Sequence, residues 1–132
     1  MIMKKGPEFL TLAEVIEIHA NQIELYGGRH GVRDMGLLQS AFAQPQAGFA
    51  GEWLHADIFH IAAAYAFHIC SNHPFFDGNK RTALAAALVF LILNGQEIKD
   101  PKQRLLDAML AMAQGKLSKE NFAQILRELA GA

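Results

Sequence analysis

The sequence predicts an all-α protein, a compact single-domain bundle of about six helices. Apolar residues recur at helical spacing in nearly every periodic segment, and the alternation that marks β-strands is missing throughout. The chain has 132 residues, the length of one ordinary domain, with no internal repeat, low-complexity tract or linker. We therefore expect residues 1–132 to form one domain around one core.

The first two helices are predicted from their capping residues. Thr11 and Glu14 have the spacing of a capping box, in which each side chain accepts a hydrogen bond from the other residue's backbone N–H. The helix that starts there continues to Leu25 and stops at the glycine-rich sequence YGGRHG. Asp34 is a suitable cap for a short second helix, which we expect to end near Pro45.

The next two helices are the most apolar of the chain. One extends over about 56–71, and the other from about Asn79 to Leu93, where Asn94 and Gly95 close it. The second is apolar on every side, which predicts a buried central helix wrapped by the others. Its apolar run is too short to cross a membrane. Five apolar residues are expected to form the face of the first helix: Ile58, Ile61, Tyr65, Phe67 and Ile69.

Two amphipathic helices complete the bundle. Asp100 followed by Pro101 predicts the start of the fifth helix, because the carboxylate can cap it and proline suits its first position. Gly115 ends this helix, and Ser118 caps the last one. The apolar residues of these two helices are Leu105, Leu106, Met109, Met112, Phe122, Ile125, Leu126 and Leu129.

The charges of the chain are nearly balanced, with 12 Lys and Arg against 13 Asp and Glu. Proteins that bind nucleic acid usually show a clustered basic footprint, so we expect no DNA binding. Cys70 is the only cysteine, which excludes an intramolecular disulfide and fits a buried, inert thiol. The first residues do not have the pattern of a signal peptide. Together these features predict a cytoplasmic protein with no membrane association.

The stretch HPFFDGNKR, residues 73–81, joins the two apolar helices, so that packing should fix both its ends. Gly78 precedes the second helix, where the absence of a side chain allows a ligand to approach the backbone closely. The first amides of that helix have no intrahelical partner and therefore form an anion site. Lys80 and Arg81 add two cations beside it.

Asp77 and His73 supply the remaining chemistry of the stretch. Asp77 offers a hard oxygen ligand that suits Mg²⁺, and His73 is the only histidine of the stretch, the residue type best suited to act as acid or base near neutral pH. A phosphate site with a metal ligand and a base is what phosphoryl or nucleotidyl transfer needs. Singly, each residue also has a structural explanation, such as a turn or a helix cap. Their coincidence within nine positions favours a functional site.

Other polar residues are better explained by structure. His55, Asp57 and His60 do not share one helical face, so a structural or surface role is favoured over a metal site. His68 is expected to be a core histidine with its hydrogen bonds satisfied. Trp53 follows a loop rich in glycine and alanine, and it either packs ordinarily or forms a flap that receives a protein target.

The stretch HPFFDGNKRTA closely resembles the motif of the Fic/Doc family, and GVRDMGLLQSAFAQPQ and ALVFLILNG resemble its Doc branch. The resemblance covers residues 26–95 approximately and implies a compact all-α fold. It implies that His73 acts as general base toward a target hydroxyl and that Asp77 holds Mg²⁺. It assigns the nucleotide phosphates to Gly78, Asn79 and Arg81, and a buried anchoring role to Phe75.

Two departures from the pattern of the Fic adenylyltransferases bear on the reaction. Lys80 stands where those enzymes have a glycine, and Leu84 where they have an arginine. A lysine fills the space of an α-phosphate, and in the Doc branch this change accompanies a reversed nucleotide whose γ-phosphate faces the target. The resemblance thus implies a Doc-like Ser/Thr protein kinase that uses ATP and Mg²⁺, with Lys80 among the nucleotide-binding residues. The Doc founder pattern has alanine at Gly78, so a Fic-type protein adenylyltransferase remains the alternative.

The resemblance also implies partners. The self-inhibiting motif of the family, Ser/Thr-x-x-x-Glu-Gly/Asn, has no match here. Restraint of this toxin would then come from a cognate, Phd-like antitoxin whose C-terminal segment orders over the active-site groove. A translation elongation factor is the suggested target class. Two other interpretations stay open: a non-catalytic module that binds nucleotide or antitoxin, and a metal-dependent phosphohydrolase, which would need a histidine and aspartate cluster.

Overall fold

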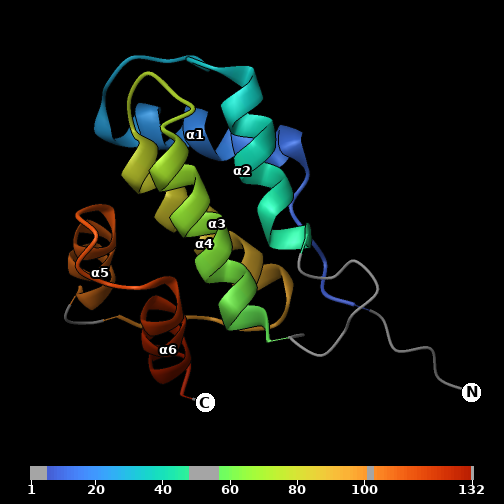
Figure 1. Ribbon diagram of the computed structural model, residues 1–132, viewed down its shortest axis with the longest axis vertical. Helices are drawn as coiled ribbons and strands as arrows, with labels where there is room; N and C mark the ends of the chain where they lie inside the picture. The colour runs from blue at the N-terminus through green and yellow to red at the C-terminus, as the bar shows by residue number, and fades with distance from the viewer. Residues whose placement is uncertain (1–5, 48–56, 101–102, 132) are drawn as a thin grey trace, which may run out of the picture.

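The computed structural model describes residues 6–47, 57–100 and 103–131, and these residues form six α-helices without a β-strand (Figure 1). The all-α prediction is therefore confirmed. Trp53 and His55 lie outside the described residues. The helices are α1 Leu12–Tyr26, α2 Met35–Ala47, α3 Ile58–Asn72, α4 Asn79–Leu93, α5 Arg104–Ala113 and α6 Lys119–Leu129.

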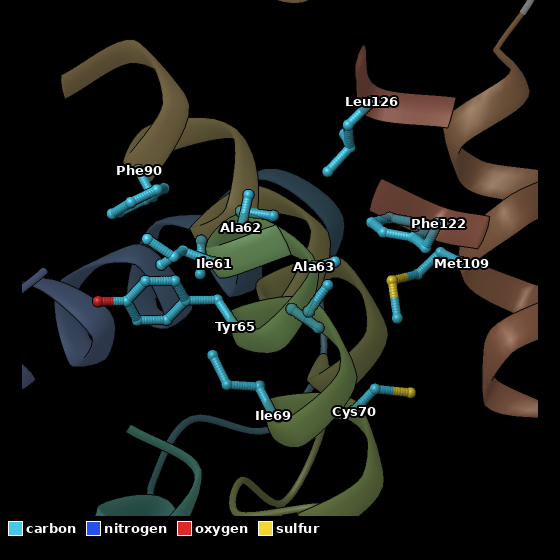
Figure 2. Packing of buried hydrophobic residues seen from close by; sticks show 14 of the residues in the cluster. Ile61, Ala62, Ala63, Tyr65, Ile69, Cys70, Phe90, Met109, Phe122 and Leu126 are labelled. Atoms are coloured by element: carbon cyan, nitrogen blue, oxygen red, sulfur yellow. The ribbon is translucent and has the colours of Figure 1, made fainter. Parts of the chain in front are cut away.

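The hairpin of α3 and α4 forms the middle of the bundle (Figure 1). Helix α3 contacts α2, α4, α5 and α6, while α4 also contacts α1 and α5. Figure 2 shows Tyr65 and Phe90 on one side of α3, with Met109 and Phe122 approaching from the other. One face of α4 is buried as predicted, whereas its opposite face remains partly open, with Ile92 61 % exposed.

Most of the predicted helix ends are confirmed. Thr11 and Glu14 form the capping box of α1, and Ser118 accepts a hydrogen bond from the backbone N–H of Asn121 at the start of α6. Asp34 Oδ1 accepts from the N–H of Leu37 and caps α2. Each of these side chains satisfies an amide that the first helical turn leaves without a partner.

Helix α2 is described as far as Ala47, two residues after Pro45, which agrees with the end expected near that proline. One predicted boundary is wrong. Helix α5 begins at Arg104 and not after Asp100, because Gln103 has a left-handed backbone conformation that no α-helix can pass through. Pro101 lies outside the described residues.

Asp100 and Asp57 are nevertheless capping residues. The two carboxylate oxygens of Asp100 accept hydrogen bonds from the N–H groups of Arg104 and Leu105. Asp57 caps α3 through the N–H of Phe59, and it pairs with Arg127 and with His60. The structural role predicted for Asp57 and His60 is thus confirmed.

The segment before α1 is tied to the middle of the bundle at two residues. The hydroxyl of the fully buried Tyr65 accepts a hydrogen bond from the N–H of Leu10 over 3.0 Å. Burial raises the pKa of Tyr65 to about 12, against a lowering by that hydrogen bond. The amide of Asn94 bonds both the N–H and the C=O of Glu8, at 2.8 and 2.9 Å.

Among the described residues, no helix is long and apolar enough to cross a membrane.

Candidate active site

The loop between α3 and α4 lies beside the segment that joins α1 to α2, at the same end of the molecule (Figure 1). The two segments pair through an antiparallel bridge between Val32 and Phe75. The carbonyl of Pro74 accepts hydrogen bonds from the N–H groups of Arg33 and Asp34, at 2.7 and 3.1 Å. The predicted loop is therefore held by backbone pairing with residues about 40 positions earlier in the chain.

His73 is exposed and ends α3 in the left-handed conformation, with φ 48° and ψ 53°. This conformation costs a residue other than glycine about 1–2 kcal/mol. The guanidinium of Arg33 donates two hydrogen bonds to the carbonyl oxygen of His73, from Nε at 2.8 Å and from Nη2 at 2.6 Å. The imidazole Nδ1 lies 3.4 Å from the side-chain nitrogen of Asn79, with donor and acceptor roles that depend on the tautomer.

Asn79 is buried, and its side chain holds the loop. Its oxygen accepts from the N–H of Phe75 and its nitrogen donates to the C=O of Phe75, both at 3.0 Å. The same nitrogen reaches toward His73. Its side-chain amide is thus bound to the protein. The backbone N–H of Asn79 belongs to the first turn of α4, where amides have no intrahelical partner and could bind an anion.

Asp77 is exposed and fixed from two directions. Its Oδ2 accepts a hydrogen bond of 2.7 Å from the N–H of Arg29, and its backbone carbonyl lies 2.8 Å from His19 Nε2. Its Oδ1 accepts no hydrogen bond from the described residues. The carboxylate therefore keeps an oxygen for a ligand while its position is held by α1 and the α1–α2 segment.

His19 of α1 forms the inner wall of the site. His19 is 3 % exposed, and its ring stacks on the ring of Phe75, with 3.8 Å between centroids. Burial lowers the pKa of His19, against a raising by its hydrogen bond to Asp77. Because a carbonyl oxygen can only accept, Nε2 of His19 carries a hydrogen and donates the hydrogen bond to the carbonyl of Asp77. Phe75 is 1 % exposed, which confirms its predicted burial as an anchor.

Gly78 has φ 76°, a conformation that suits glycine. A Cβ atom there would lie 3.0 Å from Ile23 Cδ1 and 3.8 Å from the ring of His19. The left-handed backbone and the close packing against Ile23 of α1 thus both favour the glycine that the sequence places before α4.

Lys80 and Arg81 are both exposed in the first turn of α4. The guanidinium of Arg81 lies 4.1 Å from the ring centroid of Tyr26, a cation–π contact that fixes its direction. Arg29 makes the same kind of contact with Phe76, at 3.7 Å. The positive end of α4 and these cations give this face of the loop the charge that a polyphosphate needs.

A groove of about 550 Å³ starts beside this face and runs between α1, α4 and the beginning of α5. Tyr26 and Arg81 line it at the site, and Leu84, Leu88 and Leu106 give it an apolar floor. Leu84 is the position where the Fic pattern has an arginine, so the groove wall is apolar there. The groove therefore has one cationic end and one apolar stretch.

The residues fit a magnesium ion that is shared with a nucleotide better than a metal cluster. No group of three or more histidine, cysteine or acidic side chains gathers for a metal among the described residues. Asp77 offers one carboxylate, and Mg²⁺ usually takes one or two of these together with phosphate oxygens and water. The histidine and aspartate cluster that a phosphohydrolase would need is missing from the part of the chain described.

Sequence reasoning did not anticipate the supporting residues His19, Arg29 and Arg33. A histidine on an otherwise apolar helix face was the available signal for His19, because a buried polar side chain requires a partner. Arg33 and Arg29 carry no such signal, because a charged residue in a polar segment is ordinarily exposed. The core role predicted for His68 holds in part: its ring is half-buried against Phe67 and bonds to Lys119 Nζ over 3.2 Å.

Comparison with known proteins bears on this arrangement. The model of the Fic/DOC family matches residues 9–91. The chain belongs to the Fic/DOC family. It is 37 % identical over 119 residues to the Protein kinase doc of Escherichia phage P1, an alignment that covers 90 % of this chain and 93 % of that protein. It is also 45 % identical over 73 residues to the Toxin Doc of Mycolicibacterium smegmatis, covering 55 % and 56 % of the two chains.

These similarities place the chain in the Doc toxin branch of the family. The matched region contains all of α1 to α3, the loop and most of α4. It therefore includes His73, Asp77 and the residues that hold them.

Proposed function

We propose that this Doc-like protein is a toxin that transfers the γ-phosphoryl group of Mg-ATP to a serine or threonine hydroxyl of a bacterial protein. The observation that carries the proposal is that His73 and Asp77 lie on one loop, each held by a hydrogen bond, beside the cationic start of α4. Lys80 in that first turn favours the kinase over the adenylyltransferase, because it occupies space that an α-phosphate would need. The kinase name of the phage P1 relative agrees with this reaction.

The residues divide the work of the transfer. The exposed imidazole of His73 removes the proton of the target hydroxyl as its oxygen attacks the γ-phosphorus, and ADP leaves with the electrons of the broken bond. The amides at the start of α4, with Lys80 and Arg81, hold the phosphate oxygens. Asp77 holds Mg²⁺, which neutralises charge on those oxygens. A translation elongation factor is the target class that we propose.

The groove between α1 and α4 is the place that we propose for the antitoxin. Its apolar floor suits one face of a segment that folds on binding, and Arg81 offers a partner for an acidic side chain. A Phd-like C-terminal segment seated there would cover the nucleotide cradle. We expect the product of the gene next to its own to co-purify with this chain, and Leu88→Glu to reduce the amount recovered at least tenfold.

ATP labelled at the α- or the γ-position tests the reaction. Wild type, incubated with bacterial lysate and Mg²⁺, should transfer the γ-label to a protein, and His73→Ala should reduce transfer by roughly 10²- to 10⁴-fold. Label from the α-position would make the chain an adenylyltransferase, the alternative that Gly78 favours. Release of labelled phosphate without any labelled protein would instead indicate a phosphohydrolase.

A growth assay separates the toxin from a non-catalytic binding module. Cells that express wild type should stop growing, whereas cells that express the same amount of soluble His73→Ala should grow. Equal growth of the two cultures would leave the chain as a module that binds nucleotide or antitoxin without catalysis.

A further inference from the structure

Arg33 contacts the residue that carries the proposed base, although its own side chain lies outside the loop. It comes from the α1–α2 segment, 40 positions before His73, and it donates from Nε and Nη2 to the carbonyl oxygen of His73. A third hydrogen bond, from Nη2 at 3.3 Å, goes to the carbonyl of Asn72. The guanidinium thus binds the last two carbonyls of the α3 terminus.

The contact of the Arg33 guanidinium stabilises the C-terminal end of α3 in two ways. The last carbonyls of a helix have no intrahelical partner, and they form its negative end. A cation that donates to them is therefore favourable. His73 also holds a left-handed backbone that an L-residue rarely adopts, so that groups outside the helix must stabilise it. The planar guanidinium, with two parallel N–H groups on one oxygen, does this in a way that an ammonium cannot.

Arg33 is itself held in place. Its N–H donates to the carbonyl of Pro74, and the neighbouring Val32 forms the bridge with Phe75. Asp34, the next residue, caps α2, and the side-chain nitrogen of Asn72 donates to the carbonyl of Leu37 in that helix. The guanidinium therefore starts from a fixed backbone that is tied to the same loop and to α2.

We propose that Arg33 is a positioning residue that fixes the backbone of His73 and so directs its imidazole toward the nucleotide and the target hydroxyl. The proposal rests on the function proposed above, because it assumes that His73 is the base. It assigns Arg33 no contact with either substrate. An exposed arginine near a phosphate site could instead bind nucleotide or a protein partner, and these roles predict different kinetics.

The kinetic test compares Arg33→Ala and Arg33→Lys with Arg104→Ala, a charge-matched control on α5 whose guanidinium pairs with Glu128. Arg33→Ala should lower kcat by roughly 10- to 100-fold with little change in KM for ATP or target, because small misplacement of a catalytic group has effects of this size. Added guanidinium ions should restore part of the lost kcat in Arg33→Ala. Arg33→Lys, which keeps the charge, should recover less than half of it. Raised KM with unchanged kcat would overturn the proposal in favour of substrate binding.

A spectroscopic test does not depend on catalysis. The imidazole signals of His73 in a ¹³C–¹H spectrum are identified by their loss in His73→Ala. They should shift or broaden in Arg33→Ala and remain as in wild type in Arg104→Ala. Unchanged His73 signals would overturn the positioning role even if kcat fell. If the His73 signals shift in Arg33→Ala but wild type transfers no label, the contact is upheld and the proposed function alone is rejected. If Arg33→Ala fails to fold, Arg33→Lys gives the same two readings.

Discussion

An asparagine stands at each end of α4, Asn79 as its first residue and Asn94 directly after its last, and both make the same pair of hydrogen bonds. At its start, Asn79 binds the N–H and C=O of Phe75, and at its end Asn94 binds the N–H and C=O of Glu8. In each case the side-chain amide makes the two hydrogen bonds that a backbone peptide group would make: its oxygen accepts from an N–H and its nitrogen donates to a C=O. A glycine with positive φ flanks each asparagine: Gly78 before the first and Gly95 after the second.

The two ends differ in burial. Asn79 and Phe75 are 6 % and 1 % exposed, whereas Asn94 is half-buried and Glu8 is exposed. Water can replace a lost hydrogen bond at Glu8 but not at Phe75. The same pair of hydrogen bonds therefore contributes more to the free energy of unfolding at Phe75 than at Glu8. The buried pair fixes the loop that carries His73. The exposed pair only attaches the segment before α1.

Asn79→Ala should have the largest effect. It leaves the N–H and C=O of Phe75 buried without partners, which should lower the free energy of unfolding by about 3 kcal/mol. Denaturant melts measure this change, and label transfer per folded molecule should fall at least tenfold, as expected for a misplaced loop. A loss of activity no greater than the loss of folded protein would contradict the link between this pair and the site.

Tyr65 gives a pH-dependent effect at the other end, where it holds Leu10 close to Glu8. Its pKa is raised to about 12 in the folded protein, so the unfolded chain releases the proton first. Its contribution to stability is complete below pH 10 and is lost as the pH rises toward 12, by about 2 kcal/mol. Melts at pH 9 to 12 should show a steeper decline for wild type than for Tyr65→Phe. Parallel curves would contradict the buried, neutral hydroxyl.

The flanking glycines sharpen the comparison. Gly78→Ala should lower the free energy of unfolding by about 1.5 kcal/mol. The alanine would have to adopt a left-handed backbone, and its methyl group would contact Ile23. Gly95→Ala adopts the same kind of backbone with no atom within 4 Å of the new Cβ, and should cost less. Melting temperatures of the two variants compare them directly. A smaller cost at Gly78 would mean that Ile23 moves aside freely.

Asn94→Ala should have the smallest effect, about 1 kcal/mol, because water can satisfy much of what the exposed Glu8 loses. Label transfer per folded molecule should equal that of wild type. Hydrogen exchange of the Glu8 and Leu10 amides should increase. An effect on transfer as large as that of Asn79→Ala would show that the two ends are not independent.

Helix bounds could be predicted from the sequence better than the side chains that hold the loop of the candidate site. The bounds of α4 were predicted to the residue, because a glycine, a polar first turn and an Asn-Gly end mark them. The starts of α1 and α6 followed from short-range caps. The early start predicted for α5 failed at Gln103, whose left-handed backbone has no signature in its residue type.

The residues that hold the loop could not be predicted, for a different reason. His19 and Arg33 act through hydrogen bonds to backbone carbonyls 58 and 40 positions away. A backbone carbonyl is the same at every residue, so no pattern in a single sequence identifies which one a side chain will bind. His73, Asp77 and Lys80 were found because their chemistry is concentrated in one short stretch.

The packing of α6 against α3 has a consequence for folding of the protein during its synthesis. Helix α6 contributes Phe122 and Leu126 to the core against α3, from which two helices separate it in the chain (Figure 2). A nascent chain that still has α6 inside the ribosome leaves this part of α3 uncovered, and domains generally fold as units. We therefore expect the core beneath the loop of residues 73–78 to close only after α6 has left the ribosome.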